Sequence, residues 1–540
     1  MNPAVAWSRT RPTVVGRKAA VASAHPLASQ VGLDILRQGG NAVDAAIATA
    51  VALGVVEPYM SGVGGVGFLL LHLAGGETKV LNFCGNTPAR ATPDQFDLVT
   101  RELGPKASMI PGNVAGWFEA LRVHGTLRFE QVLQPAIELA EQGFGLHSFN
   151  VELIRSSLPR LNSAGLQVWG SAHLRIGARV CQPELARTLQ ALAAEGPDWF
   201  YRGPFATQLD RFMQEAGGLM TATDLAGYRP DWEQPIETSY RGHRVRTCPP
   251  NNEGFQILQT LRLLEPENLA ALGHNSADYL HLVTEAAKLA IADRIAHAGD
   301  PRFQPVPLDW LLSPDYISRR RAMIQRTTAS RSEGERWNGG QIPPVVPPGS
   351  QHGSTTHLSV VDEAGNVASI TQSLGHGFGS GCFVPGTGVA LNSFCYWCEI
   401  DPSCPTPNLM APGKRWAACM APVQVFHDDG RFWFAVSTPG SYGILHTTLQ
   451  MLLNIIDFGA DLQAAIDAPR FRLFEGTRMQ IETRVPPNVL QQLSQRGHHL
   501  ELIGDFNFVV GGGQGVMIDP ESGTRLAGAD PRRDGYALAW

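Results

Sequence analysis

The chain has 540 residues, 44% of them hydrophobic and 17% charged, which is enough for a large buried core. Its formal net charge of −6, without a basic stripe, argues against a nucleic-acid-binding protein. The sequence shows neither an apolar signal-peptide core nor an apolar run near the roughly 18 residues of a membrane span, so we expect a soluble, cytoplasmic protein of enzyme size.

The N-terminal part begins with helical periodicity. Residues 28–56 are rich in Ala, Leu and Ile at helical spacing, and Gly39-Gly40 divides them into two predicted helices, the second capped by Asn41. Two predicted strands follow, Phe68–Leu73 and Thr78–Phe83. We expect these elements to pack together at the start of one core.

The turn before the first strand has the spacing G-x-G-x-x-G, at Gly62, Gly64 and Gly67. A dinucleotide-binding fingerprint follows a strand and opens a helix, whereas this turn follows a helix and opens a strand. The motif therefore predicts a tight turn where backbones approach closely.

The middle of the chain is predominantly helical and then changes character. Helical runs alternate with turns over residues 114–230, and Gln256–Leu263 and Ala277–His297 also read as helices. The segment 326–354 is polar and then rich in Pro and Gly, which predicts a flexible linker. Beyond it, Thr355–Val361 and Val367–Leu374 predict a hairpin, followed by strands near 388–392, 423–427 and 431–436 and a helix over 444–457.

The junction at Thr355 raises a specific chemical possibility. A threonine hydroxyl becomes an effective nucleophile when the same residue is an N-terminus, because the α-amine can accept its proton. A linker that delivers Ser354-Thr355 to the head of a strand suits a cut before Thr355. Local pattern alone leaves the alternative open that Thr355 and Thr356 are β-branched residues opening a strand.

The eight cysteines do not predict a disulfide framework in a chain of this length. Cys395 and Cys398, with Cys404 nearby, give a weak metal or redox hint. No second C-x-x-C pair or matching histidine pair completes a zinc set, so we expect buried thiols and no metal.

Motifs along nearly the whole chain resemble the γ-glutamyltransferase family of N-terminal nucleophile (Ntn) hydrolases. The stretch "HGSTTHLSVVDEAGNVASITQSL" is similar to that family's autoprocessing site. Further blocks resemble the family in the same order: "GGNAVDAAIA" (39–48), "EPYMSGVGGVGF" (57–68), "PGNVAGW" (111–117), "DLAGYRP" (224–230), "EAAKLAIADR" (285–294), "STPGS" (437–441), "DAPRF" (467–471) and "DPRRDG" (530–535).

The resemblance implies an α+β fold, the Ntn-hydrolase αββα sandwich of two stacked antiparallel sheets between helical layers. It implies autocatalytic cleavage at the Ser354–Thr355 bond into a large subunit, 1–354, and a small catalytic subunit, 355–540, which together form one domain. It further implies a heterodimer of these fragments, leaves open a dimer of that heterodimer, and implies no cofactor.

The resemblance also assigns the catalytic residues. Thr355 matches the nucleophile, whose α-amine is the base, and Thr356 a second threonine that supports the site. Ser373 matches a hydroxyl that bonds the nucleophile, where the family usually has Thr. Gly440 and Ser441 match the two backbone donors of an oxyanion hole, the second of which is usually Gly.

The substrate-binding positions depart from the family. Cys84 stands where the family has an arginine for the glutamyl carboxylate, and Ala418 and Cys419 replace paired serines. Gly375 replaces an asparagine, and Trp397 belongs to a run, 394–397, without the family's acid. Core packing and pocket lining both remain open for that run, and Arg90, His376 or Arg415 could supply a replacement charge.

These departures leave three hypotheses. The first is an acylase or amidohydrolase that cleaves a non-glutamyl amide through an acyl-threonine ester, with transfer to water or an amine. Its substrate would be a small amide such as oxamate, or an apolar, aromatic or cephalosporin-type acyl amide. The second is a genuine γ-glutamyltransferase or glutathione hydrolase with a rewired clamp, and the third is an uncleaved, non-enzymatic homologue.

Overall fold

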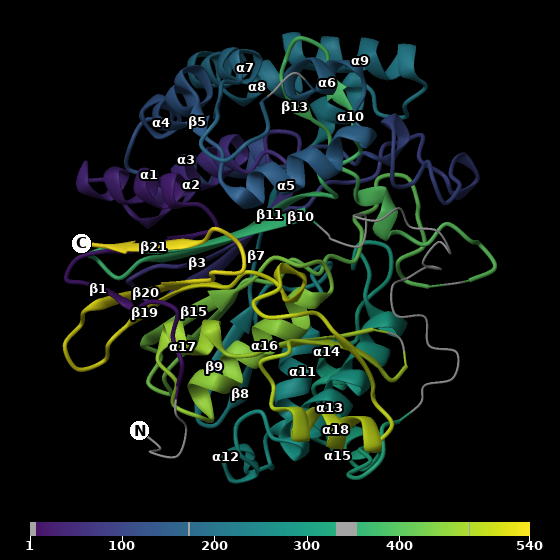
Figure 1. Ribbon diagram of the computed structural model, residues 1–540. Helices are drawn as coiled ribbons and strands as arrows, with labels where there is room; N and C mark the ends of the chain where they lie inside the picture. Colours follow the sequence, from purple (N-terminus) through teal and green to yellow (C-terminus); the bar gives the residue numbers. More distant parts are fainter. Residues whose placement is uncertain (1–6, 171–172, 331–353, 405, 475) are drawn as a thin grey trace.

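The computed structural model describes residues 7–170, 173–330, 354–404, 406–474 and 476–540. Most of the predicted linker, 331–353, therefore lies outside the described residues. Two seven-stranded sheets lie face to face between two helical layers, which confirms the predicted αββα sandwich (Figure 1). Among the described residues, none of the helices combines the length and the apolar character of a membrane span.

Both sheets combine strands from either side of the Ser354–Thr355 bond. The strands of one sheet are, in spatial order, β1 (Val14–Gly16), β20 (Arg525–Ala529), β19 (Gln514–Ile518), β15 (Phe432–Ser437), β14 (Val423–Phe426), β9 (His243–Thr247) and β8 (Ile236–Tyr240). The strands of the other are β21 (Tyr536–Ala539), β2 (Ala20–Ser23), β10 (Ser354–Val361), β11 (Val367–Gly375), β3 (Val66–His72), β4 (Thr78–Phe83) and β7 (Asp231–Glu233).

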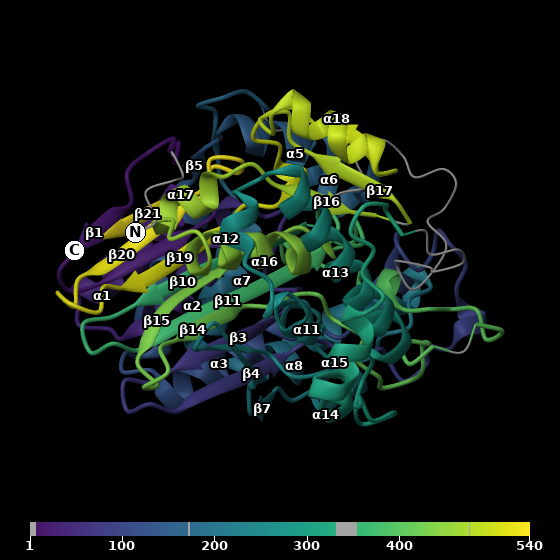
Figure 2. The same ribbon diagram turned by 90° about the horizontal axis from the view of Figure 1, so that it is seen from below.

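The helices form an outer layer on each sheet (Figures 1 and 2). Those beside the β10 sheet are α1 (Pro26–Arg37), α2 (Ala42–Val56), α3 (Asn113–His124), α4 (Phe129–Gln142), α5 (Ser148–Ser157), α6 (Ser163–Trp169), α7 (Pro183–Glu195), α8 (Pro197–Tyr201), α9 (Pro204–Ala216) and α10 (Ala222–Gly227). Those beside the other sheet are α11 (Phe255–Leu264), α12 (Leu269–Leu272), α13 (Ala277–His297), α14 (Leu308–Leu311), α15 (Pro314–Arg321), α16 (Gly443–Ile456), α17 (Leu462–Asp467) and α18 (Pro487–Gln495).

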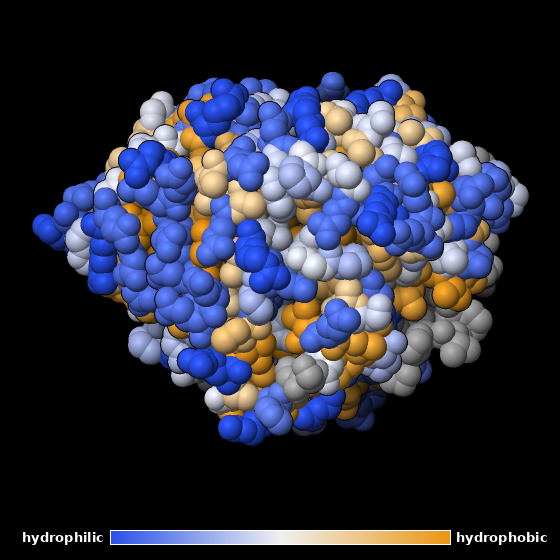
Figure 3. All heavy atoms as spheres, turned by 90° about the horizontal axis from the view of Figure 1, so that it is seen from above, coloured by the Kyte–Doolittle hydropathy of each residue, from blue (hydrophilic) through white to orange (hydrophobic). Residues whose placement is uncertain are grey.

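Smaller elements lie around this frame. They are the sheet of β16 (Phe471–Leu473), β17 (Arg478–Ile481) and β18 (His499–Leu502), the pairs β5 (Phe144–Gly145) with β6 (Arg179–Val180) and β12 (Phe383–Val384) with β13 (Val389–Ala390), and the 3-10 helices η1 (Pro93–Gln95), η2 (Pro105–Ala107), η3 (Leu158–Arg160), η4 (Phe394–Trp397) and η5 (Phe508–Val510). The face of the first helical layer seen in Figure 3 is mainly hydrophilic.

The β10 sheet is apolar on both faces because it has a layer on each side. On β3, Leu69 and Leu71 belong to the core under α2, whereas Phe68 and Leu70 belong to the core that contains residues of the facing sheet. The two-residue alternation of a strand divides these side chains between the two cores. All fifteen residues of α2 are buried, which explains why that helix has no polar face.

The start of α2 fixes the hairpin that carries Thr355. As predicted, Asn41 caps the helix, accepting from the backbone N–H of Val43 at 2.8 Å. Asp362, in the β10–β11 turn, accepts from the N–H of Ala42 at 2.9 Å. A carboxylate is favoured at a helix N-terminus, so this contact anchors the hairpin to a helix from the other side of the linker.

Candidate active site

The Ser354–Thr355 bond lies at an irregularity in the β10–β11 ladder. Thr355 pairs with Ser373 and Ser354 pairs with Gly375, which leaves Leu374 as an extra residue between them. Bulges of this kind redirect side chains and are common beside active sites. Ser354 and Thr355 are both buried, so the bond is held within the sheet.

The Ser373 hydroxyl joins the predicted nucleophile to the carbonyl that it would attack. It accepts from Oγ1 of Thr355 at 3.1 Å and from the backbone N–H of Gly375 at 2.9 Å. It donates to the carbonyl oxygen of Ser354. One hydroxyl has one donor and two acceptor sites, so these three bonds use all of its capacity and fix its orientation.

Thr356 points to the opposite side of the strand and contacts a buried acid. Its hydroxyl donates to Oε2 of Glu57 at 3.0 Å. Burial raises the pKa of Glu57 to about 8, although the positive charge of Arg533 and the Thr356 bond both act to lower it. Thr356 therefore supports the nucleophile strand from behind.

The predicted oxyanion loop runs between β15 and α16. Gly440 has φ +135° and Ser441 has φ +56°, and the first of these conformations is suited only to glycine. Among the described residues no acceptor is found for the backbone N–H groups of Gly440 and Ser441. Two adjacent unused donors at the start of a helix can stabilise a developing negative charge.

Arg533 links this loop to the nucleophile. Its Nη1 donates to the carbonyl oxygen of Thr355 at 3.2 Å, and its stem lies against Gly512, where a β-carbon would meet Cδ at 2.7 Å. The N–H of Gly512 in turn donates to Oγ1 of Thr438 at 2.7 Å, two residues before Gly440. The guanidinium therefore connects the strand and the loop through a short path of contacts.

All the predicted substrate-binding residues are buried, and we call them together the wall: Cys84, Gly375, Trp397, Ala418 and Cys419. A β-carbon on Gly375 would lie 3.2 Å from the indole of Trp397, which places that ring one contact from the Ser373 network. The rings of Trp397 and Trp416 are 5.5 Å apart, and Trp416 precedes Ala418 and Cys419 by two and three residues. The aromatic run 394–397 thus packs in the core and also reaches the neighbourhood of Thr355.

Cys84 lies at the far end of the same wall. Nδ2 of Asn251 donates to its Sγ at 3.4 Å and to the carbonyl oxygen of Trp416 at 2.7 Å. The backbone N–H of Ala418 donates to the carbonyl of Asn251 at 2.8 Å. Burial raises the pKa of the Cys84 thiol to about 12, so the thiol is neutral.

The structure separates the three candidates for a replacement charge. Arg90 is exposed and donates to the carbonyl of Leu219 at 3.3 Å. Burial holds the pKa of His376 well below its usual value, so that ring is uncharged. Arg415 is the cation beside Cys84, but it already pairs with Asp231 and Glu233.

Sequence reasoning did not single out three charged residues of this region, Glu57, Arg533 and Arg472. Glu57 and Arg533 fall inside the quoted blocks "EPYMSGVGGVGF" and "DPRRDG". However, the contact of Glu57 with Thr356 spans 299 positions, and that of Arg533 with Thr355 spans 178. Arg472 stands between two apolar residues in "FRL", a pattern that fits an ordinary strand with one solvent-facing residue, so the sequence gives no signal of its burial.

The other sequence hints lead away from catalysis. Cys395 and Cys398 are buried. Among the described residues the one candidate metal cluster is His281, Glu285 and His498, where the two rings bond each other at 2.8 Å and Lys288 already pairs with Glu285.

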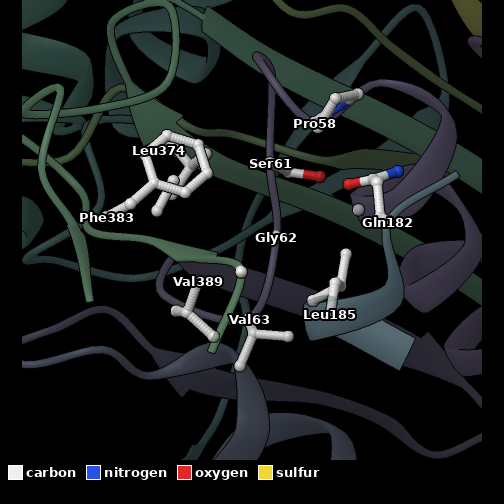
Figure 4. Close-up of a pocket in the computed structure, with 12 residues that line it drawn as sticks. Pro58, Ser61, Gly62, Val63, Gln182, Leu185, Leu374, Phe383 and Val389 are labelled. Atoms are coloured by element: carbon white, nitrogen blue, oxygen red, sulfur yellow. The ribbon is translucent and has the colours of Figure 1, made fainter. Parts of the chain in front are cut away.

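The glycine-rich turn is a packing site. Gly62 closely approaches Gly54, with a β-carbon on Gly54 reaching within 3.0 Å of its Cα. Figure 4 shows this turn with the side chains of Ser61 and Gln182 close to it. They line a cavity of about 20 Å³. That volume suits a water molecule and not a nucleotide.

Comparisons with known proteins show what the whole chain is similar to. A family model described as gamma-glutamyltranspeptidase matches residues 28–540. The chain is 36% identical to the acylase ACY 1 proenzyme of Pseudomonas sp. (strain SE83), covering 97% of this chain and 94% of the relative. It is 35% identical to the glutathione hydrolase proenzyme of Bacillus subtilis (strain 168), covering 99% and 94%. The crystal structure of cephalosporin acylase from Bacillus halodurans superposes with a TM-score of 0.89 at 31% identity, covering 100% and 99%.

Proposed function

The chain belongs to the gamma-glutamyltranspeptidase family of Ntn hydrolases, enzymes that act on amide bonds, and we propose that it is an autoprocessing acylase with Thr355 as its N-terminal nucleophile. The single observation that carries this proposal is the Ser373 hydroxyl, which bonds both Oγ1 of Thr355 and the carbonyl oxygen of Ser354. This hydroxyl therefore touches both the proposed nucleophile and the carbonyl group that it would attack.

In the first reaction, Oγ1 of Thr355 attacks the carbonyl carbon of Ser354. Its proton passes to Ser373, which delivers its own proton toward the carbonyl oxygen as negative charge develops there. The C–N bond then breaks as the C=O bond re-forms, the proton on that oxygen passes to the amide nitrogen of Thr355, and an ester joins Ser354 to Oγ1. Water cleaves the ester and leaves a free α-amine on Thr355.

In the second reaction, the α-amine of Thr355 serves as the base for its own hydroxyl. The hydroxyl attacks an amide substrate, the N–H groups of Gly440 and Ser441 stabilise the oxyanion, and the amine half leaves with a proton. Water or an acceptor amine then opens the acyl ester. The relay needs only the chain's own groups, so the proposal includes no cofactor.

The two fragments, 1–354 and 355–540, would remain a heterodimer after the cut. β10 and β11 are central strands of their sheet, paired with β2 and β3 from the other side of the linker. The names of the relatives, both proenzymes, support cleavage of this kind.

We further propose that the substrate is not an ordinary γ-glutamyl compound. The wall of Cys84, Trp397, Ala418 and Cys419 offers apolar and thiol groups where a zwitterionic glutamyl head would need a cation and an acid. Arg415 beside Cys84 is the observation that favours the second candidate, a γ-glutamyltransferase with a rewired clamp. Rates on γ-glutamyl-p-nitroanilide and on uncharged acyl anilides would separate the two.

The intact mass of the purified protein tests the cut. Cleavage before Thr355 divides the 58.3 kDa chain, in proportion to length, into about 38 and 20 kDa. We expect both fragments from the natural chain and a single uncut chain from Thr355→Ala. An uncut natural chain, or fragments that persist in Thr355→Ala, would refute Thr355 as the processing nucleophile.

A further inference from the structure

Arg533 is a buried cation beside the proposed nucleophile. It is 2% exposed, and its Nη1 donates to the carbonyl oxygen of Thr355 at 3.2 Å. Its Nη2 donates to the carbonyl oxygen of Phe508 at 3.4 Å, and among the described residues no carboxylate forms an ion pair with the guanidinium. Removing a cation from water without a counter-charge is costly, so its presence at this position calls for an explanation.

The two acids that act most strongly on Arg533 leave much of its charge uncompensated. Asp530 is already held by two other arginines, Arg470 and Arg532. Burial raises the pKa of Glu57 to about 8, so this acid is mostly protonated at neutral pH. Burial also lowers the pKa of Arg533, to about 10, which still leaves the guanidinium charged at neutral pH. A positive charge therefore persists next to the nucleophile strand.

The cut before Thr355 would create an α-amine on the same residue whose carbonyl oxygen Arg533 binds. Three bonds join the nitrogen and the carbonyl oxygen of one residue, so the new amine lies within roughly 7 Å of Nη1. A cation at this distance disfavours the protonated amine, and the burial of Thr355, which is 4% exposed, acts in the same direction. Both effects favour the neutral amine, which is the form that can accept a proton from Oγ1.

Few other ionisable groups lie near this amine. Of the elements that pack against β10, the strands β2, β11, β15 and β19 have no ionisable side chain, and α2 has only Asp44, in its first turn beside the far end of the hairpin. On β10 itself, burial lowers the pKa of His357 to about 3 and leaves it uncharged. The other ionisable groups around the site are Glu57, Tyr59, His147, His376, Arg472 and Asp534. Among the described residues, Arg533 is the only charged side chain that forms a hydrogen bond with Thr355.

We propose that Arg533 is a positioning residue of the second reaction, which holds the carbonyl group of Thr355 and favours the neutral form of its new α-amine. The inference rests on the proposed acylase function and concerns how its nucleophile is activated. The proton of Oγ1 passes to the amine and then to the nitrogen of the leaving group, and the nearby cation also favours this second transfer. In the uncut chain the same nitrogen is an amide and is no base, so the effect belongs to substrate turnover and not to cleavage.

The pH dependence of kcat/KM tests the charge of Arg533 separately from its hydrogen bond. Arg533→Lys keeps a cation, Arg533→Gln keeps a donor without a charge, and Arg533→Met has neither. With an uncharged acyl p-nitroanilide, which does not itself titrate, the acidic limb of the profile reports the free enzyme's base. We expect this limb to move up by about one pH unit in Arg533→Gln and Arg533→Met, towards the ordinary amine value of about 8, and by less than about 0.3 unit in Arg533→Lys.

Chemical labelling reads the same property without a substrate. Acetic anhydride reacts with neutral amines, so its rate at the N-terminus of the small fragment, followed by mass spectrometry from pH 5 to pH 9, reports the neutral fraction. We expect a midpoint near pH 7 in the natural protein, and a rate at pH 6.5, relative to pH 9, about 3- to 10-fold lower in Arg533→Gln. Arg525→Met is the matched control and should behave as the natural protein, because Arg525 donates to the carbonyl oxygen of Glu363 at 2.6 Å in the turn of the same hairpin.

Several outcomes would overturn the proposal. Equal labelling midpoints in the natural protein and Arg533→Gln would mean that the charge does not act on the amine. A shift in Arg533→Lys as large as that in Arg533→Gln would assign the effect to the hydrogen bond and not to the charge. If the neutral variants do not fold, the natural protein decides by itself, because a midpoint at about 8 would refute the proposal. A natural chain that stays uncut has no such amine, and in that case the proposed function itself fails.

Discussion

The nucleophile hairpin and the binding wall treat their buried polar groups in opposite ways. At the hairpin, the Ser373 hydroxyl uses its donor and both acceptor sites, and the Thr356 hydroxyl is held by Glu57. Along the wall and at Arg472 of β16, whose charge acts on Cys419, the described residues provide no partner for three buried donors: Nε1 of Trp397, Nε of Arg415 and Nε of Arg472.

The difference follows from what each region has to do. Reaction requires groups that are already in place when charge develops, and a complete set of hydrogen bonds fixes them there. Recognition requires groups whose bonding is completed by the ligand, because a site left unpaired by a wrong ligand rejects it. Changes at the hairpin should therefore act on rate, and changes at the wall on binding.

The largest expected effect breaks the hairpin network. Ser373→Ala removes the hydroxyl between Thr355 and the Ser354 carbonyl, and we expect cleavage to slow by about 10²- to 10⁴-fold, the usual contribution of a positioned proton-transfer group. The fraction of cut chain over time, from intact mass, measures it. Ser369→Ala is the control, because Ser369 bonds Ser359 at 3.2 Å in the same hairpin. Equal rates in the two variants would contradict the relay.

The next effect tests the oxyanion loop. Gly440→Ala forces a side chain onto a backbone at φ +135°, which displaces the adjacent donors, and we expect kcat to fall by about 10²- to 10³-fold. Gly430→Ala controls for strain alone, because Gly430 has φ +86° in an open turn with nothing near its would-be β-carbon. A comparable loss in both variants would mean that strain, and not the loss of donors, explains the result.

A smaller effect concerns the buried acid behind the hairpin. The pKa of Glu57 is raised to about 8, so the folded protein holds a proton that the unfolded chain releases near its ordinary value of 4.5. Between these values the folded state binds more protons, and stability falls as pH rises. We expect Glu57→Gln to remove this slope, so that its advantage in melting temperature over the natural protein grows from pH 5 to pH 8.

A suitable control for that measurement is Glu363→Gln, at the exposed turn of the same hairpin. It should keep the pH dependence of the natural protein. If the difference in melting temperature between Glu57→Gln and the natural protein stays constant from pH 5 to pH 8, Glu57 does not gain a proton on folding.

Local sequence pattern predicted the elements of the hairpin well. The alternating runs 355–361 and 367–374 became β10 and β11, and Gly39-Gly40 with Asn41 gave the break before α2. Each of these elements is determined by residues that are close together in the sequence, because strand alternation, helix caps and turns are local patterns. The wider αββα arrangement came from the family resemblance, because the pairing of β10 with β2 joins residues more than 300 positions apart.

The binding wall was harder to predict for the same reason. Arg415 came to lie beside Cys84 through pairing with Asp231 and Glu233, which no local pattern encodes. Arg472 was missed because a single charged residue in a short strand usually points to solvent. The absence of a partner became visible only when the surroundings of its guanidinium were known.

The smallest expected effect concerns the indole of Trp397. Trp397→Phe leaves a small cavity, which lowers the free energy of unfolding by about 1 kcal/mol. It also removes a buried N–H without a partner, which raises the free energy of unfolding by about 1–3 kcal/mol. We therefore expect the free energy of unfolding to stay the same or to rise slightly, as measured by urea denaturation. Cleavage before Thr355 should proceed as in the natural chain.

Trp117→Phe is the matched control for this prediction. Trp117 is buried as well, but its Nε1 donates to Oε1 of Gln372 at 3.0 Å, so the same substitution leaves an acceptor without its partner. Trp117→Phe should therefore be less stable than Trp397→Phe by about 1–3 kcal/mol. Equal losses in the two variants would mean that the Trp397 donor is satisfied in solution, and the wall would then not differ from the hairpin at this position.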